Sequence, residues 1–234
     1  LREKMTYREL WQNIMYYRGH DRMPVIHWAG WTETRKRWIE EGMPEDANEH
    51  EFLNALPHWT WVGVNIELYP AFEEELIKET DEYRIIRGRD GVVQQEWKDK
   101  SCIPHYIDWT LKTATDWDKY KIRLQPHPER IPEDLDTKIR EAEKSGLPIA
   151  IGTASLMGWI RNWMGVENMS YLMYDNPDVY ADMVNTLADL TCWGIDQVVP
   201  RMNGKPDMGF GWEDICGKTG PLVSPGIFRR CVAP

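Results

Sequence analysis

The stretch that decides the fold is Met208-Gly-Phe-Gly-Trp-Glu-Asp214, a short apolar run that ends in two adjacent acidic residues. A turn rich in Gly and Pro follows, and Ser224-Pro225 then has the residue types of a helix N-cap and first helical position. This order predicts a strand, an acidic strand end, a loop and a helix. In α/β barrels the functional side chains lie where strands feed such loops.

Three further segments predict strands, near residues 25, 61 and 147, and amphipathic helical stretches separate them. The run Gly146–Gly152 is apolar without interruption, which is typical of a strand buried on both faces. Alternating strands and helices predict a parallel sheet. Because no Gly-x-Gly-x-x-Gly is present, the pattern favours about half of a (β/α)₈ TIM barrel over a dinucleotide-binding sheet. Residues 83–97, centred on Asp90-Gly91, predict an antiparallel β-hairpin inserted outside it.

Composition limits the classes of function. With 234 residues, 42% of them hydrophobic, the chain is long enough for one domain over residues 1–234. The net charge of −10 argues against a nucleic-acid partner. No signal peptide and no apolar run of about 20 residues is present, so we expect a cytoplasmic protein without a membrane partner. Since the chain starts at Leu1 and stops just after a predicted helix begins, we expect a fragment truncated at its C-terminus.

The cysteines and tryptophans bear on thiol state, metal binding and the kind of ligand. The four cysteines are widely spaced and predict free, mostly buried thiols. Cys102 and His105 could form a ligand pair, but Pro104 between them and the lack of a second pair argue against a metal site. Thirteen tryptophans against four phenylalanines suggest that some indoles line a pocket for a flat or ring-shaped ligand, while most serve packing.

Several segments, taken in order, resemble the uroporphyrinogen decarboxylase superfamily, which includes cobamide-dependent methyltransferases. They are Asp21–Val25, Tyr69–Glu75, the Asp90-Gly91 hairpin, Trp117–Leu124, Met157–Trp159, Met164–Glu167, Tyr174–Pro177 and Trp212–Pro225. The resemblance covers nearly the whole chain and implies a TIM barrel of which about half lies beyond Pro234.

Departures from the family pattern bear on the substrate. In the superfamily that this chain resembles, the true uroporphyrinogen decarboxylases carry Arg-Gln-Ala-Gly-Arg after the first strand. The arginines of this motif hold the substrate carboxylates. Here the stretch is Ile26-His-Trp-Ala-Gly-Trp31, in which Ala29-Gly30 match and both arginines are missing. Where the family has a catalytic Asp after the second strand, this chain has Asn65 and Glu67, and Trp159 falls near the family's substrate-facing Tyr. Burying several carboxylates without cationic partners is costly, so uroporphyrinogen fits poorly.

The candidate site residues follow or end predicted strands. Candidate catalytic residues are His27, Glu67, Glu213 and Asp214; candidate substrate-binding residues are Trp28, Trp31, Asn65, Trp159 and Trp212. Each candidate also has a structural alternative. His27 could be a hydrogen-bonded core histidine, and Glu67 could form a surface salt bridge. The acidic pair could contact a helix N-terminus or a loop, and the tryptophans could serve packing. We expect the catalytic candidates and Trp28 to meet in one cavity.

The expected function is that of an enzyme of this superfamily, a methyltransferase acting on a corrinoid or a small methyl donor. A decarboxylase of uroporphyrinogen or a related tetrapyrrole is the first alternative; a glycoside hydrolase barrel and a non-catalytic binding protein are others. The methyltransferase hypothesis implies two cofactors, a corrinoid and a zinc ion with His and Cys ligands beyond residue 234. The decarboxylase hypothesis implies no cofactor. Expected partners are a small or tetrapyrrole-like ligand and a corrinoid protein, and a homodimer stays open.

Overall fold

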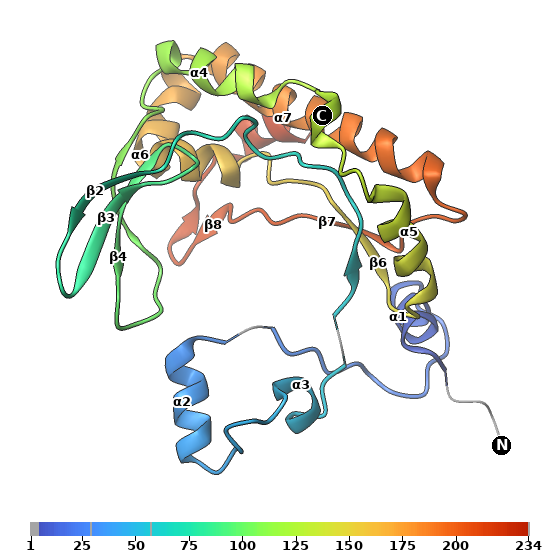
Figure 1. The fold of residues 1–234 in the computed structure, drawn as a ribbon. Helices are drawn as coiled ribbons and strands as arrows, with labels where there is room; N and C mark the ends of the chain where they lie inside the picture. Colours follow the sequence, from blue (N-terminus) through green and yellow to red (C-terminus); the bar gives the residue numbers. More distant parts are fainter. Residues whose placement is uncertain (1–4, 29, 57, 234) are drawn as a thin grey trace.

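The computed structural model describes residues 5–28, 30–56 and 58–233, and it has a mixed α/β fold (Figure 1). A parallel sheet has the order β1-β6-β7, formed by β1 (Thr60–Trp61), β6 (Ile149–Gly152) and β7 (Met208–Phe210). An antiparallel sheet has the order β2-β3-β4-β5, and β8 (Cys216–Gly217) pairs with β9 (Gly220–Pro221). Ala29, part of the expected family match, lies outside the described residues, as does Pro57.

The helices have the following bounds: α1 (Tyr7–Met15), α2 (Thr32–Glu40), α3 (Glu49–Phe52), α4 (Asp118–Lys121), α5 (Leu135–Lys144), α6 (Gly158–Asp175), α7 (Pro177–Val198) and α8 (Pro225–Ile227). Short 3-10 turns cover Ala114–Asp116, Ile122–Leu124, Pro128–Arg130 and Val199–Arg201, and a π turn covers Phe228–Val232. None of the described helices is long and apolar enough to cross a membrane.

The parallel sheet contains three of the four expected strands in chain order. Thr60 is in register with Ile149, and Ala150 with Met208. The segment near residue 25 is different, because it makes a single parallel bridge, Ile26 to Leu56, and no strand. Val25 is 57% exposed, so this segment lacks the burial that holds β6 between its neighbours. The described residues therefore form an open sheet rather than a closed barrel.

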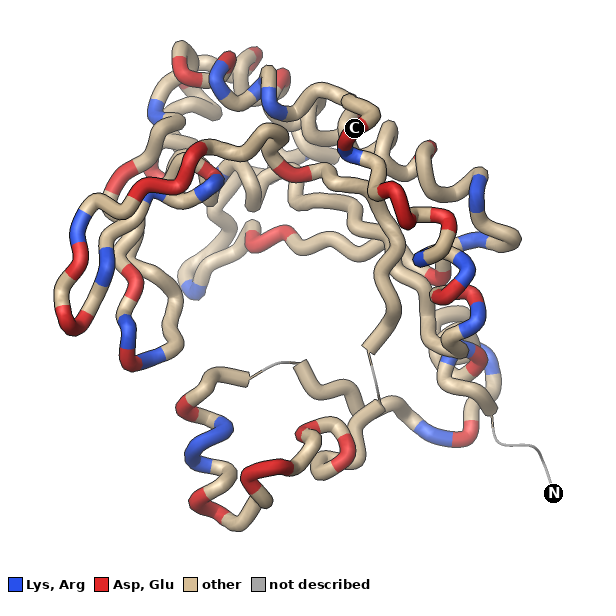
Figure 2. Tube along the Cα trace, in the orientation of Figure 1, with Lys and Arg blue, Asp and Glu red and all other residues tan. Residues whose placement is uncertain are grey.

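The central strand β6 is buried because helices cover the outer face of the parallel sheet. Ile149 and Ile151 of β6 pack with Leu135 and Ile139 of α5 and with Val198 of α7 in one apolar cluster. Figure 1 shows α5 and α7 on the outer side of β6 and β7. In Figure 2 both strands are free of charged residues, whereas acidic and basic residues alternate along α5. Charged residues thus lie on the solvent-facing helix and are missing from the strands. This is why the uncharged run over β6 predicts a buried strand.

The expected hairpin over residues 83–97 belongs to a larger sheet. Its strands are β3 (Tyr83–Arg87) and β4 (Val92–Trp97), flanked by β2 (Glu75–Glu79) and β5 (His105–Trp109). The flanking strands β2 and β5 are not among the elements that the sequence predicts. Both flanking strands are largely exposed, so neither carries the apolar alternation that predicts a strand.

Gly165 fixes where this antiparallel sheet meets α6. Its backbone has φ +76°, a left-handed conformation that glycine adopts freely, and it interrupts the regular helix between two helical stretches. A Cβ at this position would lie 2.8 Å from the Trp109 ring of β5. The glycine therefore allows both the kink and the close approach of the indole.

Asp207 ties α1 to the amino ends of β6 and β7. Its carboxylate side chain is only 2% exposed and lies 2.9 Å from the Arg8 Nε. Gln12 Nε2 donates to it at 2.6 Å and the Ile149 backbone N–H at 2.7 Å. A buried carboxylate with three donors is satisfied, but removing it would leave those donors without an acceptor.

We therefore expect Asp207→Ala to lower the free energy of unfolding by about 2–4 kcal/mol. The measurement is urea unfolding, with Asp189→Ala on the exposed side of α7 as a control that changes stability by less than about 0.5 kcal/mol. Equal unfolding midpoints for the two variants would contradict the anchoring role of Asp207.

Candidate functional site

A cavity of about 500 Å³ lies at the carboxyl ends of the three parallel strands. Trp61, Asn65 and Glu67 contribute from the end of β1 and the segment after it, and Gly152 and Ala154 from the end of β6. Phe210 and Trp212 contribute from β7 and the residues after it, and Trp159 from the first turn of α6. Its volume is in the range of small-molecule sites, and its position is the one where parallel α/β proteins bind ligands.

A larger cavity of about 1210 Å³ adjoins the first and shares Asn65, Glu67 and Trp159 with it. The segment over residues 65–74, the sheet strands β3 and β4, and α6 form its walls. We assign the candidate site to the smaller cavity because strand ends from three parallel strands surround it, while the larger one extends toward the exposed sheet.

Arg130 holds the segment that both cavities share. The side chain is 1% exposed, and its guanidinium donates to the backbone carbonyls of Asn65 at 3.0 Å and Glu67 at 2.7 Å, as well as those of Arg123 and Gln125. Burial lowers the pKa of this guanidinium. The Asn65 side-chain oxygen in turn accepts from the Glu67 N–H at 2.9 Å, which closes a local turn.

Aromatic side chains surround Phe210 at the strand ends. The Trp61 ring stands edge-on to it at 5.1 Å, and the Trp28 ring stacks on it at 6.1 Å with an interplanar angle of 8°. Trp59 contacts both Phe210 and Trp61. The cluster places Trp28 beside the cavity wall, although Trp28 itself does not line the cavity.

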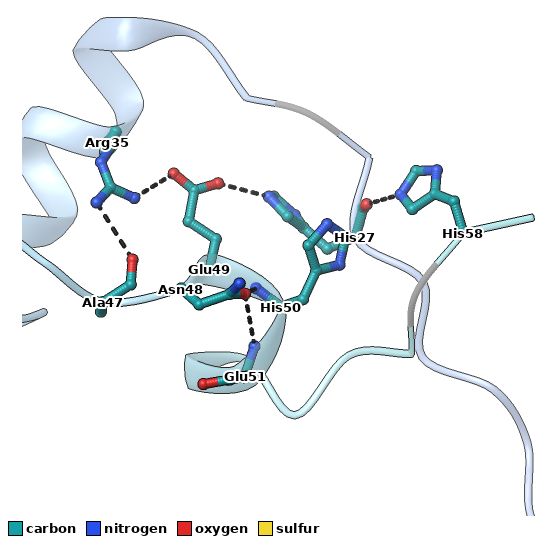
Figure 3. Close-up of polar contacts among 8 residues, drawn as sticks. All are labelled: His27, Arg35, Ala47, Asn48, Glu49, His50, Glu51 and His58. Atoms are coloured by element: carbon teal, nitrogen blue, oxygen red, sulfur yellow. Dashed lines mark hydrogen bonds and ion pairs between the residues drawn. The ribbon is translucent and has the colours of Figure 1, made fainter.

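His27 lies in a separate polar cluster, shown in Figure 3. Its Nε2 is 2.9 Å from Glu49 Oε2, and Arg35 donates to the other carboxylate oxygen at 2.6 Å. The hydrogen bonds from Arg35 and then His27 hold the pKa of the Glu49 carboxyl below its ordinary value. His50 and His58 lie nearby, with the His50 ring 5.5 Å from that of His27 and 5.3 Å from that of His58. These bonds join α2 to α3, so the geometry gives His27 a structural partner.

Glu213 points at the helix layer. Its carboxylate accepts hydrogen bonds from the backbone N–H groups of Leu156, Met157 and Gly158, the last at 3.1 Å, at the start of α6. An anion is favourable there because the first N–H groups of a helix lack partners within it. Asp214 is 68% exposed and pairs with Arg161 at 3.3 Å.

The expected meeting of all catalytic candidates in one cavity therefore does not occur. Asn65, Glu67, Trp159 and Trp212 line the smaller cavity, whereas His27, Glu213 and Asp214 line neither of the two cavities. Trp31 is 52% exposed and precedes α2, also outside both. The acidic pair follows a strand as expected, but the carboxylate of its first member turns toward α6, where the backbone N–H groups of Leu156, Met157 and Gly158 donate to it.

Sequence reasoning missed Arg130, Asp90, Trp61 and Phe210. Asp90 was taken only as a turn residue, yet it lines the larger cavity, and burial raises the pKa of its carboxyl. Phe210 and Trp61 end β7 and β1, which are shorter than the strands that the sequence predicts around them, so their place at the strand ends was not visible. Arg130 gives no local signal either, because two of the carbonyls it binds are more than 60 residues away in sequence.

The described residues form no metal-ligand group, and their cysteines are unpaired. Within residues 5–28, 30–56 and 58–233, no group of three or more His, Cys, Asp or Glu side chains could hold a metal ion. All four cysteines are free, and the expectation that most are buried was wrong, since only Cys231 is buried. In comparisons with protein-family models, curated proteins and solved structures, nothing matches this chain.

Glu213 and Asp214 form a matched pair for a stability test. We expect Glu213→Ala to cost about 1–2 kcal/mol, because the start of α6 loses its acceptor, and Asp214→Ala to cost less than about 0.5 kcal/mol. Thermal and urea unfolding measure both. If the two variants unfold alike, the capping role of Glu213 is contradicted.

Proposed function

We propose that the chain is part of a (β/α)₈ barrel enzyme of the uroporphyrinogen decarboxylase superfamily that transfers a methyl group from a small donor. The observation that carries the proposal is the aromatic cavity at the carboxyl ends of β1, β6 and β7, which pair in chain order as successive barrel strands do. Trp61, Trp159 and Trp212 supply its indole walls. A cytoplasmic location and a corrinoid-protein partner belong to the same proposal.

The charge of the cavity walls favours methyl transfer over decarboxylation. Of the described residues, Glu67 is the one charged residue lining the smaller cavity, and the larger cavity adds Glu74, Asp90 and Glu96 against Arg89. Uroporphyrinogen carries several carboxylates, which need cationic partners when they are buried. Acidic walls oppose such a ligand and suit a neutral or cationic one.

The remaining alternatives have less support. A glycoside hydrolase uses two carboxylates that flank the bond to be broken. Within the described part of the chain, the smaller cavity is lined by a single carboxylate, that of Glu67. For the zinc that the methyltransferase resemblance implies, the described residues offer no fitting ligand group, so no step is derived through a metal. In the proposed enzyme the chain's own residues enclose the donor with rings, exclude water and orient it with Asn65 and Glu67.

Two assays with the purified protein test this function. In the first assay, we expect no coproporphyrinogen from uroporphyrinogen. In the second, a thiol is supplied with methylcobalamin or, separately, with a set of small N-, O- and S-methyl donors. We expect an S-methyl product, detected by mass spectrometry. Trp212→Leu should lower the methylation rate about tenfold, which is about 1.4 kcal/mol of lost ring contact.

Trp97→Leu is the control, because Trp97 packs on Tyr83 at the far end of the antiparallel sheet. Uroporphyrinogen turnover at ordinary enzyme rates, about 1–1000 per second, would contradict the proposal. Absence of thiol methylation with every donor would contradict it as well.

A further inference from the structure

The smaller cavity combines aromatic rings with a single negative charge. Trp61, Trp159, Phe210 and Trp212 present ring surface to it. Among the residues that the structure describes, Glu67 is the one charged residue that lines it, and no Lys or Arg does. The negative face of an aromatic ring attracts cations, and indole does so most strongly. The lining therefore has the chemistry of a cation site rather than that of an anion site.

Neighbouring residues hold these rings in place. Phe210 and Trp61 pack edge to face at an interplanar angle of 84°, and Trp159 packs against Trp163 at 6.0 Å. A Cβ at Gly158 would lie 2.4 Å from the Trp212 ring, so the indole rests directly on the backbone of α6. Arg161 covers the Trp212 ring with its guanidinium 5.6 Å from the centroid. Rings fixed before binding lose little conformational freedom when a ligand enters.

The backbone of Glu67 is held by hydrogen bonds, while its carboxylate has no partner among the described residues. Its backbone carbonyl accepts from Arg130 at 2.7 Å and its N–H donates to Asn65 Oδ1 at 2.9 Å. Its carboxylate makes no hydrogen bond or ion pair with any residue in the described ranges. A fixed backbone with a free carboxylate at the rim suits a ligand that brings positive charge.

We infer that this cavity binds a quaternary ammonium cation bearing methyl groups, such as a choline-like compound. Such a cation has no N–H group to satisfy, so rings and one carboxylate suffice to hold it. The inference rests on the proposed function and names the donor class for it. Attack by a thiolate on one of the methyl groups forms the S–C bond as the N–C bond breaks, and the electron pair of that bond leaves with the neutral amine.

The test is calorimetric titration of the purified chain with choline, tetramethylammonium and the neutral alcohol in which carbon replaces the choline nitrogen. We expect choline to bind about tenfold more tightly than the neutral alcohol, because the two have the same shape and differ in charge. Glu67→Gln and Trp61→Leu should each weaken choline binding by about threefold to thirtyfold.

Control variants are Glu82→Gln, in the turn between β2 and β3, and Trp97→Leu, and both should bind choline as the parent chain does. Trp61 is 50% exposed, so its replacement leaves the fold intact, and unfolding midpoints verify this. Equal affinity for choline and the neutral alcohol, or no binding of either cation, overturns the inference. The methylation assay with other donors judges the proposed function separately, so the two failures are distinguishable.

Discussion

The guanidinium of Arg130 donates to four backbone carbonyls, and the geometry of the strand-end cavity depends on this arrangement. A buried charge without a carboxylate partner is tolerated only when every donor is satisfied. Two of the acceptors belong to Asn65 and Glu67, which line both cavities, and the other two to Arg123 and Gln125. Moving the segment after β1 would leave part of the guanidinium unsatisfied, so the charge keeps the segment in place.

A second set of hydrogen bonds, from an exposed glutamate, fixes the opposite wall. The Glu213 carboxylate holds the N–H groups that begin α6, and Trp159 stands in the first turn of that helix. Gly158 lets Trp212 lie against the same turn. The residues after β1 and after β7 are thus both held through backbone groups, which leaves the Glu67 carboxylate and the indole faces free for a ligand.

How much of this could be predicted from the sequence varies with the range of the interaction. The apolar run of β6 and the β3-β4 hairpin with its Asp90-Gly91 turn depend on local residue types, and the sequence predicts both. Strands β2 and β5 were not predicted because their exposed residues show no clear alternation of apolar and polar side chains.

The site was harder to predict than the fold. Asn65, Glu67, Trp159 and Trp212 were found because strand ends and the family pattern mark them, and the structure places all four at one cavity. The turn of Glu213 toward α6 and the pairing of His27 with Glu49 depend on partners 22 to 57 residues away. Arg130 was invisible for the same reason, since its importance arises from carbonyls that only the folded chain brings together.

Hydrogen–deuterium exchange in Arg130→Met tests the central claim most directly, with Arg140→Met on the exposed face of α5 as the control. The amides of Asn65 and Tyr69 are hydrogen-bonded to the carbonyls of Arg130 and Arg123 in the parent chain. The account predicts that Arg130→Met speeds exchange at these two amides by about tenfold or more, while the amides of β6 keep their protection. Unchanged exchange over residues 65–69, with the overall fold preserved, would contradict the claim that this guanidinium holds the cavity wall.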